Sequence, residues 1–337
     1  MGAQILGGDF QLGDVEGESL EQLQNFMAWA SKYQKSYPTK EEFLRRFKVF
    51  LGNIESLGAF IEQARGDEKF IGAPSGMHEL ELNKFADLTE EEYKALLGFK
   101  YDPATRGDAT VEPLTAEGDL PASINWAEKG FVSPVKDQGA CGSCWSFSTT
   151  GAIESALQIK TGGKQLFSEQ QLIDCSISFG NNGCSGGLVE YAFNYAKHVP
   201  METETQYPYK AANQKCAQAE LEGDLQISDF KEVQRFNPEQ LAQALNLGPV
   251  SVGVDASGVA FKFYKSGVIK KWCGTSIDHA VLAVGYGTDS DGSDYWLVKN
   301  SWGGDWGEHG YFRVLRDMSK EDEGTCGILQ TPSYPIV

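Results

Sequence analysis

The first 140 residues of this 337-residue chain contain no cysteine, although seven cysteines follow between positions 141 and 326. No apolar run approaches the roughly 18 residues needed to cross a bilayer, so we expect no membrane span. The N-terminus, Met1-Gly-Ala-Gln, lacks the basic and apolar regions of a signal peptide. The chain also has no Asn-x-Ser/Thr acceptor for an N-linked glycan.

Positive charge is scarce as well. The chain has 29 Lys and Arg against 47 Asp and Glu, for a net charge of −18. The excess of acidic side chains is shared evenly between the two parts of the chain. Residues 1–118 hold 12 basic and 21 acidic side chains, and residues 119–337 hold 17 basic and 26 acidic ones. Nucleic-acid-binding surfaces are basic, so neither part favours a nucleic-acid partner. With 41% hydrophobic residues, the chain can build one large domain or two or three smaller ones.

The odd cysteine count predicts three disulfides and one free thiol. Disulfides persist in oxidising compartments, so we expect a chain of the secretory pathway whose signal peptide has been removed. Its destination is expected to be lysosomal, vacuolar or extracellular.

Residues 19–97 are predicted to be helical. Ser19 with Gln22, and Thr39 with Glu42, have the spacing of capping boxes. The second capping box precedes a long amphipathic run that ends near Gly66. Apolar residues in this run recur at spacings of four and three, which places them on one helix face: Phe43, Phe47, Phe50, Ile54, Leu57 and Ile61. Residues 98–118 have no hydrophobic periodicity and contain many residues that break helices and strands, so we predict an extended linker there.

Helices are followed by strands in the remainder of the chain. Helices are expected from Ser143 or Cys144 to Thr161, after a cap at Ser168, and from Leu188 to Lys197. After Pro249 the sequence has the residue pattern of β-strands, and strands are predicted at 250–254, 261–269, 279–284, 295–299 and 311–315. This order indicates an α+β fold.

Two cysteines lie three positions apart in Gln138-Gly-Ala-Cys-Gly-Ser-Cys-Trp. A zinc site would need a second pair of ligands, and no histidine lies within about fifty residues of either sulfur. A thioredoxin-type redox pair would sit early in a small βαβ fold. Two structural cysteines are also compatible with the spacing. Spacing alone leaves these alternatives open beside a fourth, in which one sulfur is reactive and the other structural.

The stretch from Gln138 to Trp145 resembles the nucleophile signature of papain-like cysteine proteases. The resemblance covers 120–337 through four further motifs, which are Gly183-Cys-Ser-Gly-Gly187, Asp278-His-Ala-Val281, Lys299-Asn-Ser-Trp-Gly303 and Gly310-Tyr-Phe-Arg313. It implies a papain-like fold with two lobes, one helical and one β-barrel-like, and a cleft between them.

The N-terminal part resembles the inhibitory propeptide of the cathepsin L-like branch. The matching residues are Glu42, Arg46, Phe50 and Asn53, then Asn83, Phe85 and Asp87. We therefore predict a propeptide at 1–118 and a peptidase domain at 119–337, with the linker 98–118 lying through the cleft in the direction opposite to substrate.

The resemblance implies a division of catalytic roles. Cys144 would be the nucleophile, because a helix N-terminus and an imidazolium lower a thiol pKa from its usual value of about 8.5. His279 would hold the proton and pass it to the leaving amine, while Asn300 fixes its tautomer beneath the indole of Trp302. Gln138 would donate to the oxyanion together with the Cys144 N–H.

The resemblance also implies disulfides and substrate contacts. The pairs would be Cys141–Cys184, Cys175–Cys216 and Cys273–Cys326, which six cysteines alone do not determine. Gly186 and Gly187 would hydrogen-bond an extended peptide. The pocket for P2, the second residue before the scissile bond, would be apolar and lined by Leu188, Val189, Gly253, Ile277 and Thr331. No dipeptidase-type insertion is present, so an endopeptidase is expected.

We expect no metal and no cofactor. The expected partners are protein and peptide substrates, the chain's own propeptide as an intramolecular inhibitor, and cystatin-type inhibitors of a monomer. Protonation of paired carboxylates would release the propeptide in acid, with removal by another protease as the alternative. An inert storage or binding homologue would be expected to have lost Cys144, His279 or Gln138, and a pure inhibitor would need only the first hundred or so residues.

Overall fold

The computed structural model describes residues 19–67, 77–101, 111, 113–114, 120–217, 223 and 225–337. The chain divides into two compact units, of which the first comprises residues up to 75 and 81–93, and the second comprises 76–80 and 94–337. Much of the expected linker 98–118, at 102–110, 112 and 115–118, lies outside the described residues, as does residue 119.

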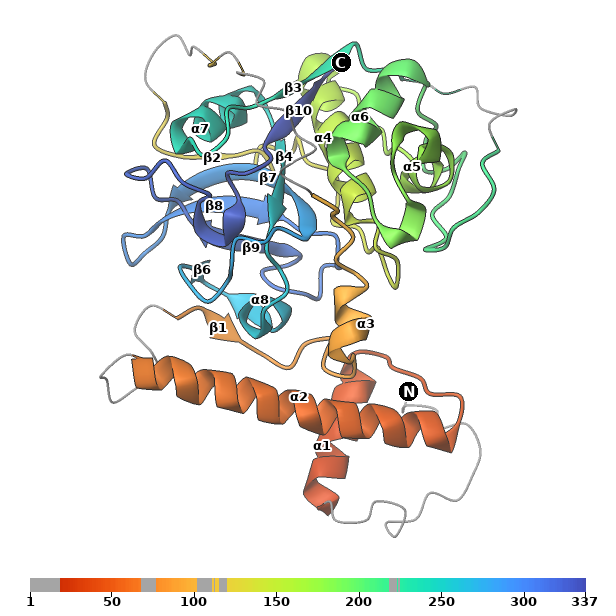
Figure 1. The fold of residues 1–337 in the computed structure, drawn as a ribbon, viewed down its shortest axis with the longest axis vertical. Coiled ribbons are helices and arrows are strands. Elements are labelled where there is room, and N and C mark those ends of the chain that lie inside the picture. The colour runs from red at the N-terminus through yellow and green to blue at the C-terminus, as the bar shows by residue number, and fades with distance from the viewer. Residues whose placement is uncertain are drawn as a thin grey trace. The chain divides into compact units, whose positions relative to one another are not determined.

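The longer helices described in the first unit are α1 at Leu20–Lys32 and α2 at Lys40–Asp67 (Figure 1). Both predicted starts are confirmed: Ser19 and Gln22 make the reciprocal capping box, and the Thr39 hydroxyl accepts the Glu42 N–H at 3.1 Å. The first part of the apolar stripe of α2 packs on α1, where the centre of the Phe26 ring lies within 5.3 Å of the ring centres of Phe43, Phe47 and Phe50, whereas Ile54 is 38% exposed.

The prediction that residues 19–97 are helical is wrong in its last part. Residues 83–88 form turns, and only α3 at Glu90–Lys94 is helical beyond them. The Asn83 side chain accepts the Phe85 N–H at 3.1 Å, and Asn53 donates to the carbonyls of Ala86 and Leu88. Short polar side chains that bond the backbone compete in this way with helix.

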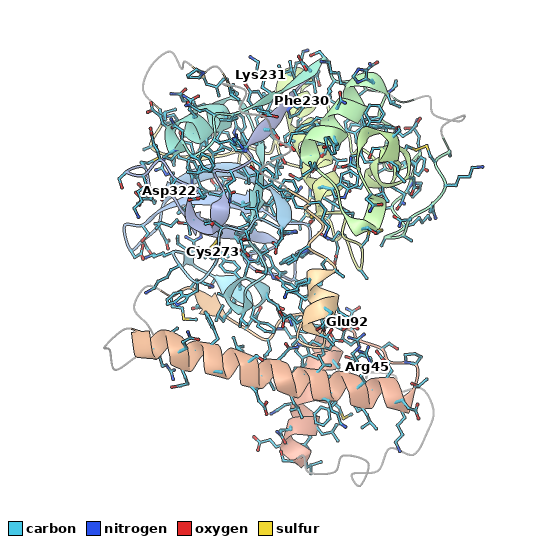
Figure 2. All side chains as sticks on the ribbon, viewed as in Figure 1. Arg45, Glu92, Phe230, Lys231, Cys273 and Asp322 are labelled. Atoms are coloured by element: carbon cyan, nitrogen blue, oxygen red, sulfur yellow. A yellow bond between two sulfur atoms is a disulfide. The ribbon has the colours of Figure 1, made fainter. Side chains whose placement is uncertain are left out.

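Ion pairs connect α2 with α3 inside the first unit. Arg46 donates to both Glu42 and Glu92, at 2.7 and 2.6 Å. Arg45 reaches Glu92 at 3.3 Å, and Figure 2 labels this second pair. These half-exposed contacts fix the register of α3 on α2 more than they add stability.

The second unit contains four longer helices beside a sheet (Figure 1). The helices are α4 at Cys144–Thr161, α5 at Glu169–Cys175, α6 at Val189–His198 and α7 at Pro238–Leu247. Shorter helical segments are α8 at Val259–Lys262, η2 at Ile177–Phe179, η3 at Gly183–Ser185 and η5 at Thr325–Gly327. The first three longer helices confirm the predictions, whereas α7 was missed.

The sheet of the second unit has the strand order β3-β10-β4-β7-β8-β9-β6, with β2 on β7. Among the described residues, these strand pairings do not close the sheet into a complete barrel. A separate antiparallel pair joins β1 to β5. The strands are β1 at Glu79–Leu80, β2 at Ile124–Asn125, β3 at Asp229–Glu232, β4 at Val250–Val254, β5 at Tyr264–Ser266, β6 at Val268–Ile269, β7 at His279–Thr288, β8 at Asp294–Lys299, β9 at Tyr311–Leu315 and β10 at Ser333–Ile336.

Four of the five predicted strands are confirmed, but the one at 261–269 is wrong in its first part. Residues 259–262 form the short helix α8, and the strands β5 and β6 follow with a break at Gly267, whose φ is +96°. Apolar runs of this length do not distinguish a buried helical turn from a strand, and a positive φ favours glycine.

Helix α4 is the centre of the second unit. It contacts β7 as well as α5 and α6, and its residues 144–155, about three turns, are all buried. It ends at Gly162, whose φ of +75° gives the left-handed C-terminal cap. This burial holds the N-terminus of α4, and therefore Cys144, in a defined place. None of the helices in the described ranges is long and apolar enough for a membrane crossing.

Candidate active site

The ends of three elements of the second unit meet at one place. Cys144 is the first residue of α4, His279 is the first residue of β7, and Asn300 directly follows β8. Strands β7 and β8 are antiparallel neighbours, with Leu282 opposite Lys299, so the start of β7 lies beside the end of β8. The sheet register thereby brings together two residues that are 21 positions apart in sequence.

The His279 ring is held in one tautomer. Its Nε2 lies 2.8 Å from Oδ1 of Asn300, and that oxygen also accepts the Ser301 N–H at 2.8 Å. A carbonyl oxygen only accepts, so Nε2 carries the hydrogen and Nδ1 carries the lone pair. Nδ1 is buried and has no hydrogen-bond partner among the described residues. The Trp302 ring stacks on the imidazole at 4.5 Å and shields the pair from water.

Cys144 is fully buried and is the one cysteine of the seven outside a disulfide. Its sulfur accepts the Ala280 N–H at 3.5 Å. Burial raises the pKa of the Cys144 thiol to about 11 and lowers the pKa of His279 to about 4. A neutral thiol and a neutral imidazole are therefore the stable forms in this state. The expected lowering of the thiol pKa is reversed here, because a covered site disfavours both charged forms.

Residues 96–101 of the chain cover the site. Gln138 donates its Nε2 to the carbonyl oxygen of Leu96 at 2.9 Å and to that of Cys141 at 2.8 Å. Further along, Gly187 donates to the Gly98 carbonyl at 2.9 Å and accepts from the Lys100 N–H at 3.2 Å. This bridge is parallel.

The Phe99 side chain fills the pocket that the family resemblance assigned to P2. A Cβ built on Gly253 would lie 2.8 Å from Phe99, 2.9 Å from Ile277 and 2.9 Å from Thr331, so these four residues enclose one space. Val189 belongs to the same buried apolar cluster as Phe99, and the partly buried Leu188 packs against that cluster. The Phe99 N–H donates to the carbonyl of Asp278 at 3.0 Å. A Cβ on Gly186 would clash at 2.5 Å with the Gly98 oxygen, which explains the small residue there.

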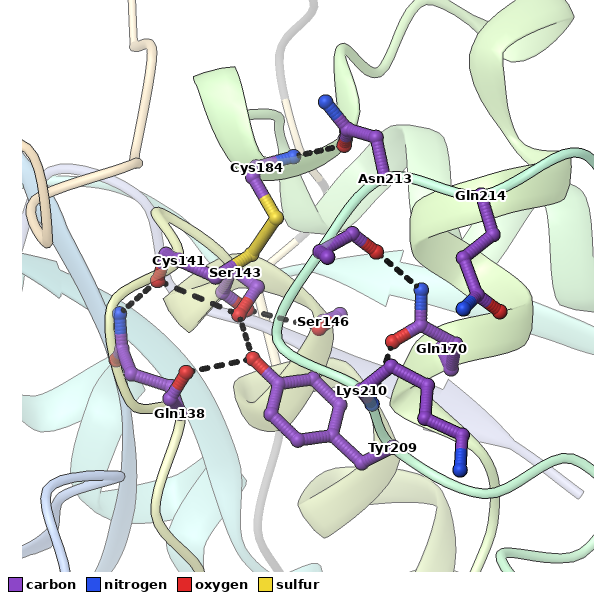
Figure 3. Close-up of a disulfide and its surroundings, with 12 residues drawn as sticks. Gln138, Cys141, Ser143, Ser146, Gln170, Cys184, Tyr209, Lys210, Asn213 and Gln214 are labelled. Carbon is purple, nitrogen blue, oxygen red and sulfur yellow. Dashed lines mark hydrogen bonds between the residues drawn. A yellow bond between two sulfur atoms is a disulfide. The ribbon is translucent and has the colours of Figure 1, made fainter.

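Two polar contacts that sequence reasoning missed hold Gln138. The Ser301 hydroxyl donates to its Oε1 at 2.7 Å, and the Tyr209 hydroxyl donates to its backbone oxygen at 2.7 Å. Tyr209 also shares a 2.8 Å hydrogen bond with Ser143 (Figure 3), so one phenol joins both ends of the loop before α4. No local sequence signal marks Tyr209, because it lies 71 positions from its partner.

The disulfides in the structure are the three pairs that the resemblance implied: Cys141–Cys184, Cys175–Cys216 and Cys273–Cys326. The first ties the loop before α4 to the turn at Gly183–Ser185 (Figure 3). Cys141 is thus structural, and Cys144 is the separate thiol. Within the described ranges, no group of three or more His, Cys, Asp and Glu side chains is placed to hold a metal ion.

Known proteins share these features. Residues 120–336 match the model of the papain family cysteine protease, and residues 26–93 match the cathepsin propeptide inhibitor domain (I29). Cysteine proteinase RD21A of Arabidopsis thaliana is 41% identical over 317 residues, which cover 92% of this chain and 66% of that relative. The chain thus spans just under two thirds of the length of this relative.

Two further relatives match over nearly their whole length. Cysteine protease XCP2 of Arabidopsis thaliana is 40% identical over 337 residues, which cover 97% of this chain and 91% of the relative. The digestive procathepsin L 3 of Tenebrio molitor larval midgut has a TM-score of 0.79 at 34% identity, and the match covers 95% of this chain and 100% of that structure. By its motifs, its fold and these similarities, the chain belongs to the papain family of cysteine proteases and carries a cathepsin propeptide inhibitor domain in its N-terminal part.

Proposed function

We propose that the chain is the zymogen of a cysteine endopeptidase with Cys144 as nucleophile. Nδ1 of His279 takes the thiol proton, and the thiolate attacks the peptide carbonyl. The imidazolium then protonates the leaving amine, and water hydrolyses the resulting thioester with His279 as base. Asn300 keeps the ring in the tautomer that leaves Nδ1 unprotonated for this exchange.

One observation carries this proposal. The amide of Gln138, completely buried near the N-terminus of α4, donates to the carbonyl oxygen of Leu96 at 2.9 Å. That carbonyl stands in for the oxygen of a peptide substrate. When the carbonyl becomes an oxyanion, a preorganised donor of this kind lowers the barrier by roughly 3 kcal/mol.

The same contact supports intramolecular inhibition. Residues 96–101 occupy the positions that a substrate needs, and in this covered state burial favours the neutral thiol and the neutral imidazole. We propose 1–118 as the inhibitory part and 119–337 as the catalytic part. Removal of the segment readmits water and allows the thiolate–imidazolium pair to form, so latency has both a steric and an electrostatic component.

The pocket around Phe99 supports an apolar preference at P2. Gly253 leaves room for a large side chain, and no acidic side chain among Leu188, Val189, Ile277 and Thr331 would pair with Arg. Activated enzyme is expected to cleave fluorogenic peptides with Leu, Phe or Val at P2 faster than a peptide with Arg there. Preference for Arg over Leu would contradict this pocket assignment.

The same proposal indicates the compartment in which the enzyme works. Three disulfides suit an oxidising compartment, and an acidic compartment such as a lysosome or vacuole suits release of the propeptide; secretion is the alternative. We expect a monomer that cystatin-type inhibitors block at the open cleft.

Activation at acid pH with a thiol reductant, followed by titration with an irreversible epoxide inhibitor, tests the proposed function. One equivalent of epoxide is expected to abolish peptidase activity and to modify Cys144 alone. The matched control is Cys144→Ser, which should neither mature by itself nor bind the epoxide. Modification at Cys141, or full activity of the Cys144→Ser variant, would overturn the assignment.

A further inference from the structure

Arg235 lies beside the floor of the Phe99 pocket. The backbone on either side of it is bonded to residues 329–332, since Val233 donates to Pro332 and Phe236 donates to Leu329, both at 2.9 Å. That segment carries Thr331, which lines the pocket. Arg235 is only partly buried and therefore can meet a group that enters the cleft.

The guanidinium of Arg235 already contacts the segment in the cleft. Its Nη1 donates to the Tyr101 hydroxyl at 3.2 Å. The Tyr101 ring is stacked on the Phe99 ring at 6.3 Å with an interplanar angle of 5°. No carboxylate in the described part of the chain forms an ion pair with Arg235, whose guanidinium otherwise lies 5.8 Å from the centre of the Phe236 ring.

The order of contacts along this segment can be transferred to a substrate. Leu96 lies at Gln138, Phe99 fills the P2 pocket and Tyr101 lies beyond it. In an extended chain, alternate residues lie on one side. A substrate with P2 in the Phe99 pocket therefore directs P4, the fourth residue before the scissile bond, to the place that Tyr101 now occupies. This holds for either chain direction.

We propose that Arg235 is a specificity-determining residue that favours a carboxylate side chain at P4. A guanidinium has only donors and stays charged, so it needs an acceptor and prefers an anionic one. Glutamate or aspartate at P4 gains an ion pair that Tyr101 does not provide, whereas lysine or arginine is repelled. The inference rests on the proposed peptidase function, because it concerns the substrates of that site.

The test uses activated enzyme and three fluorogenic peptides that share Leu at P2 and carry Glu, Ala or Lys at P4. For an exposed charge pair, we expect kcat/KM for the Glu peptide to exceed that for the Lys peptide by about five- to tenfold at low salt. Arg235→Ala is expected to bring this ratio near unity, and Arg235→Glu to invert it. Added salt should shrink the ratio in the unmodified enzyme.

Lys231 provides the matched control, because it is an exposed cation on β3 only four positions away (Figure 2). Lys231→Ala is expected to leave the Glu-to-Lys ratio unchanged. Epoxide titration of each variant normalises its rate to the folded, active fraction, so a folding defect does not mimic a change in specificity.

The outcomes separate this inference from the proposed function. Failure to cleave all three peptides, including the one with Ala at P4, would overturn the peptidase assignment. Cleavage with no Glu-to-Lys discrimination, or with discrimination that survives Arg235→Ala, would overturn the role of Arg235 alone.

Discussion

At the scale of single residues, Ser301 connects the two polar halves of the site. Its N–H donates to Oδ1 of Asn300, and its hydroxyl donates to Oε1 of Gln138. The second bond fixes which end of the Gln138 amide faces the Leu96 carbonyl, because Oε1 accepts and Nε2 donates. Ser301 is thus a positioning residue that touches neither the nucleophile nor the substrate.

Ser301→Ala should reduce kcat of the activated enzyme about fivefold with little change in KM, since one neutral hydrogen bond contributes about 1 kcal/mol. Peptide hydrolysis after epoxide titration measures both constants. In a Gln138→Ala background the same substitution should have almost no effect, because the oriented group is gone. Equal losses in both backgrounds would contradict the positioning role.

At the scale of elements, β1 attaches an early part of the chain to the second unit. It pairs with β5, and His78 just before it is buried against the Tyr264 ring at 5.5 Å. His78 Nε2 donates to the Ala260 carbonyl at 3.0 Å, while its Nδ1 has no partner among the described residues. A protonated ring would leave a buried N–H unsatisfied, and burial accordingly lowers the pKa of His78.

This burial predicts a pH dependence for release of β1. The docked imidazole has the lowered pKa, and the released one returns to about 6.5, so protons bind the released state more tightly. Docking is therefore unaffected well above pH 6.5 and weakens as the pH falls below it, by up to about tenfold per pH unit. The flanking Lys265–Glu79 pair is exposed and contributes little.

His78→Gln should remove much of the acceleration of zymogen activation between about pH 6.5 and pH 5, because glutamine keeps a donor for Ala260 but does not titrate in this range. Appearance of epoxide-labelled mature enzyme measures the rate. His198→Gln, at an exposed histidine, is the control and should behave as the unmodified chain does. An unchanged pH profile in His78→Gln would assign the acid response to carboxylates instead.

At the scale of the whole molecule, buried charges join the helices of the second unit to its sheet. Lys136 pairs with Glu154 of α4 at 2.7 Å and with Glu169 of α5 at 2.5 Å. Lys299 at the end of β8 donates to Ser133, which in turn donates to Glu154. Both carboxylates are at most 2% exposed. The adjoining cavity, of about 20 Å³, is large enough for a water molecule.

Lys136→Met should lower the free energy of unfolding by about 3–5 kcal/mol, because it leaves two buried carboxylates without their cation. Denaturant unfolding of the Cys144→Ser zymogen with its disulfides intact measures this loss. Lys164→Met, at an exposed position, should change stability by less than about 0.5 kcal/mol. A small loss for Lys136→Met would mean that water or Lys299 compensates the carboxylates.

The elements that the sequence predicted well are those with local signals. Ser19 and Ser168 cap their helices through side chains three residues away, and alternating or continuous apolar runs mark strands such as 250–254. Helix α7 carried equally local signals, an Asn237 cap and Pro238 in its first turn, and was missed all the same. The helix predicted through 83–88 failed because its turns depend on Asn53, 30 and more positions away.

The sequence by itself determined the family resemblance, because its motifs match at fixed spacings, and the candidate catalytic residues and cysteine pairs followed from that resemblance. Only the tertiary structure decided the state of the site. The carbonyl of Leu96 accepts from Gln138, Phe99 lies against Gly253, and burial reverses the direction of the thiol pKa that the helix N-terminus alone would predict. Contacts such as Tyr209 on Gln138 and Arg235 on Tyr101 join residues 71 and 134 positions apart. No local pattern encodes them, since they exist only once the fold has brought those surfaces together.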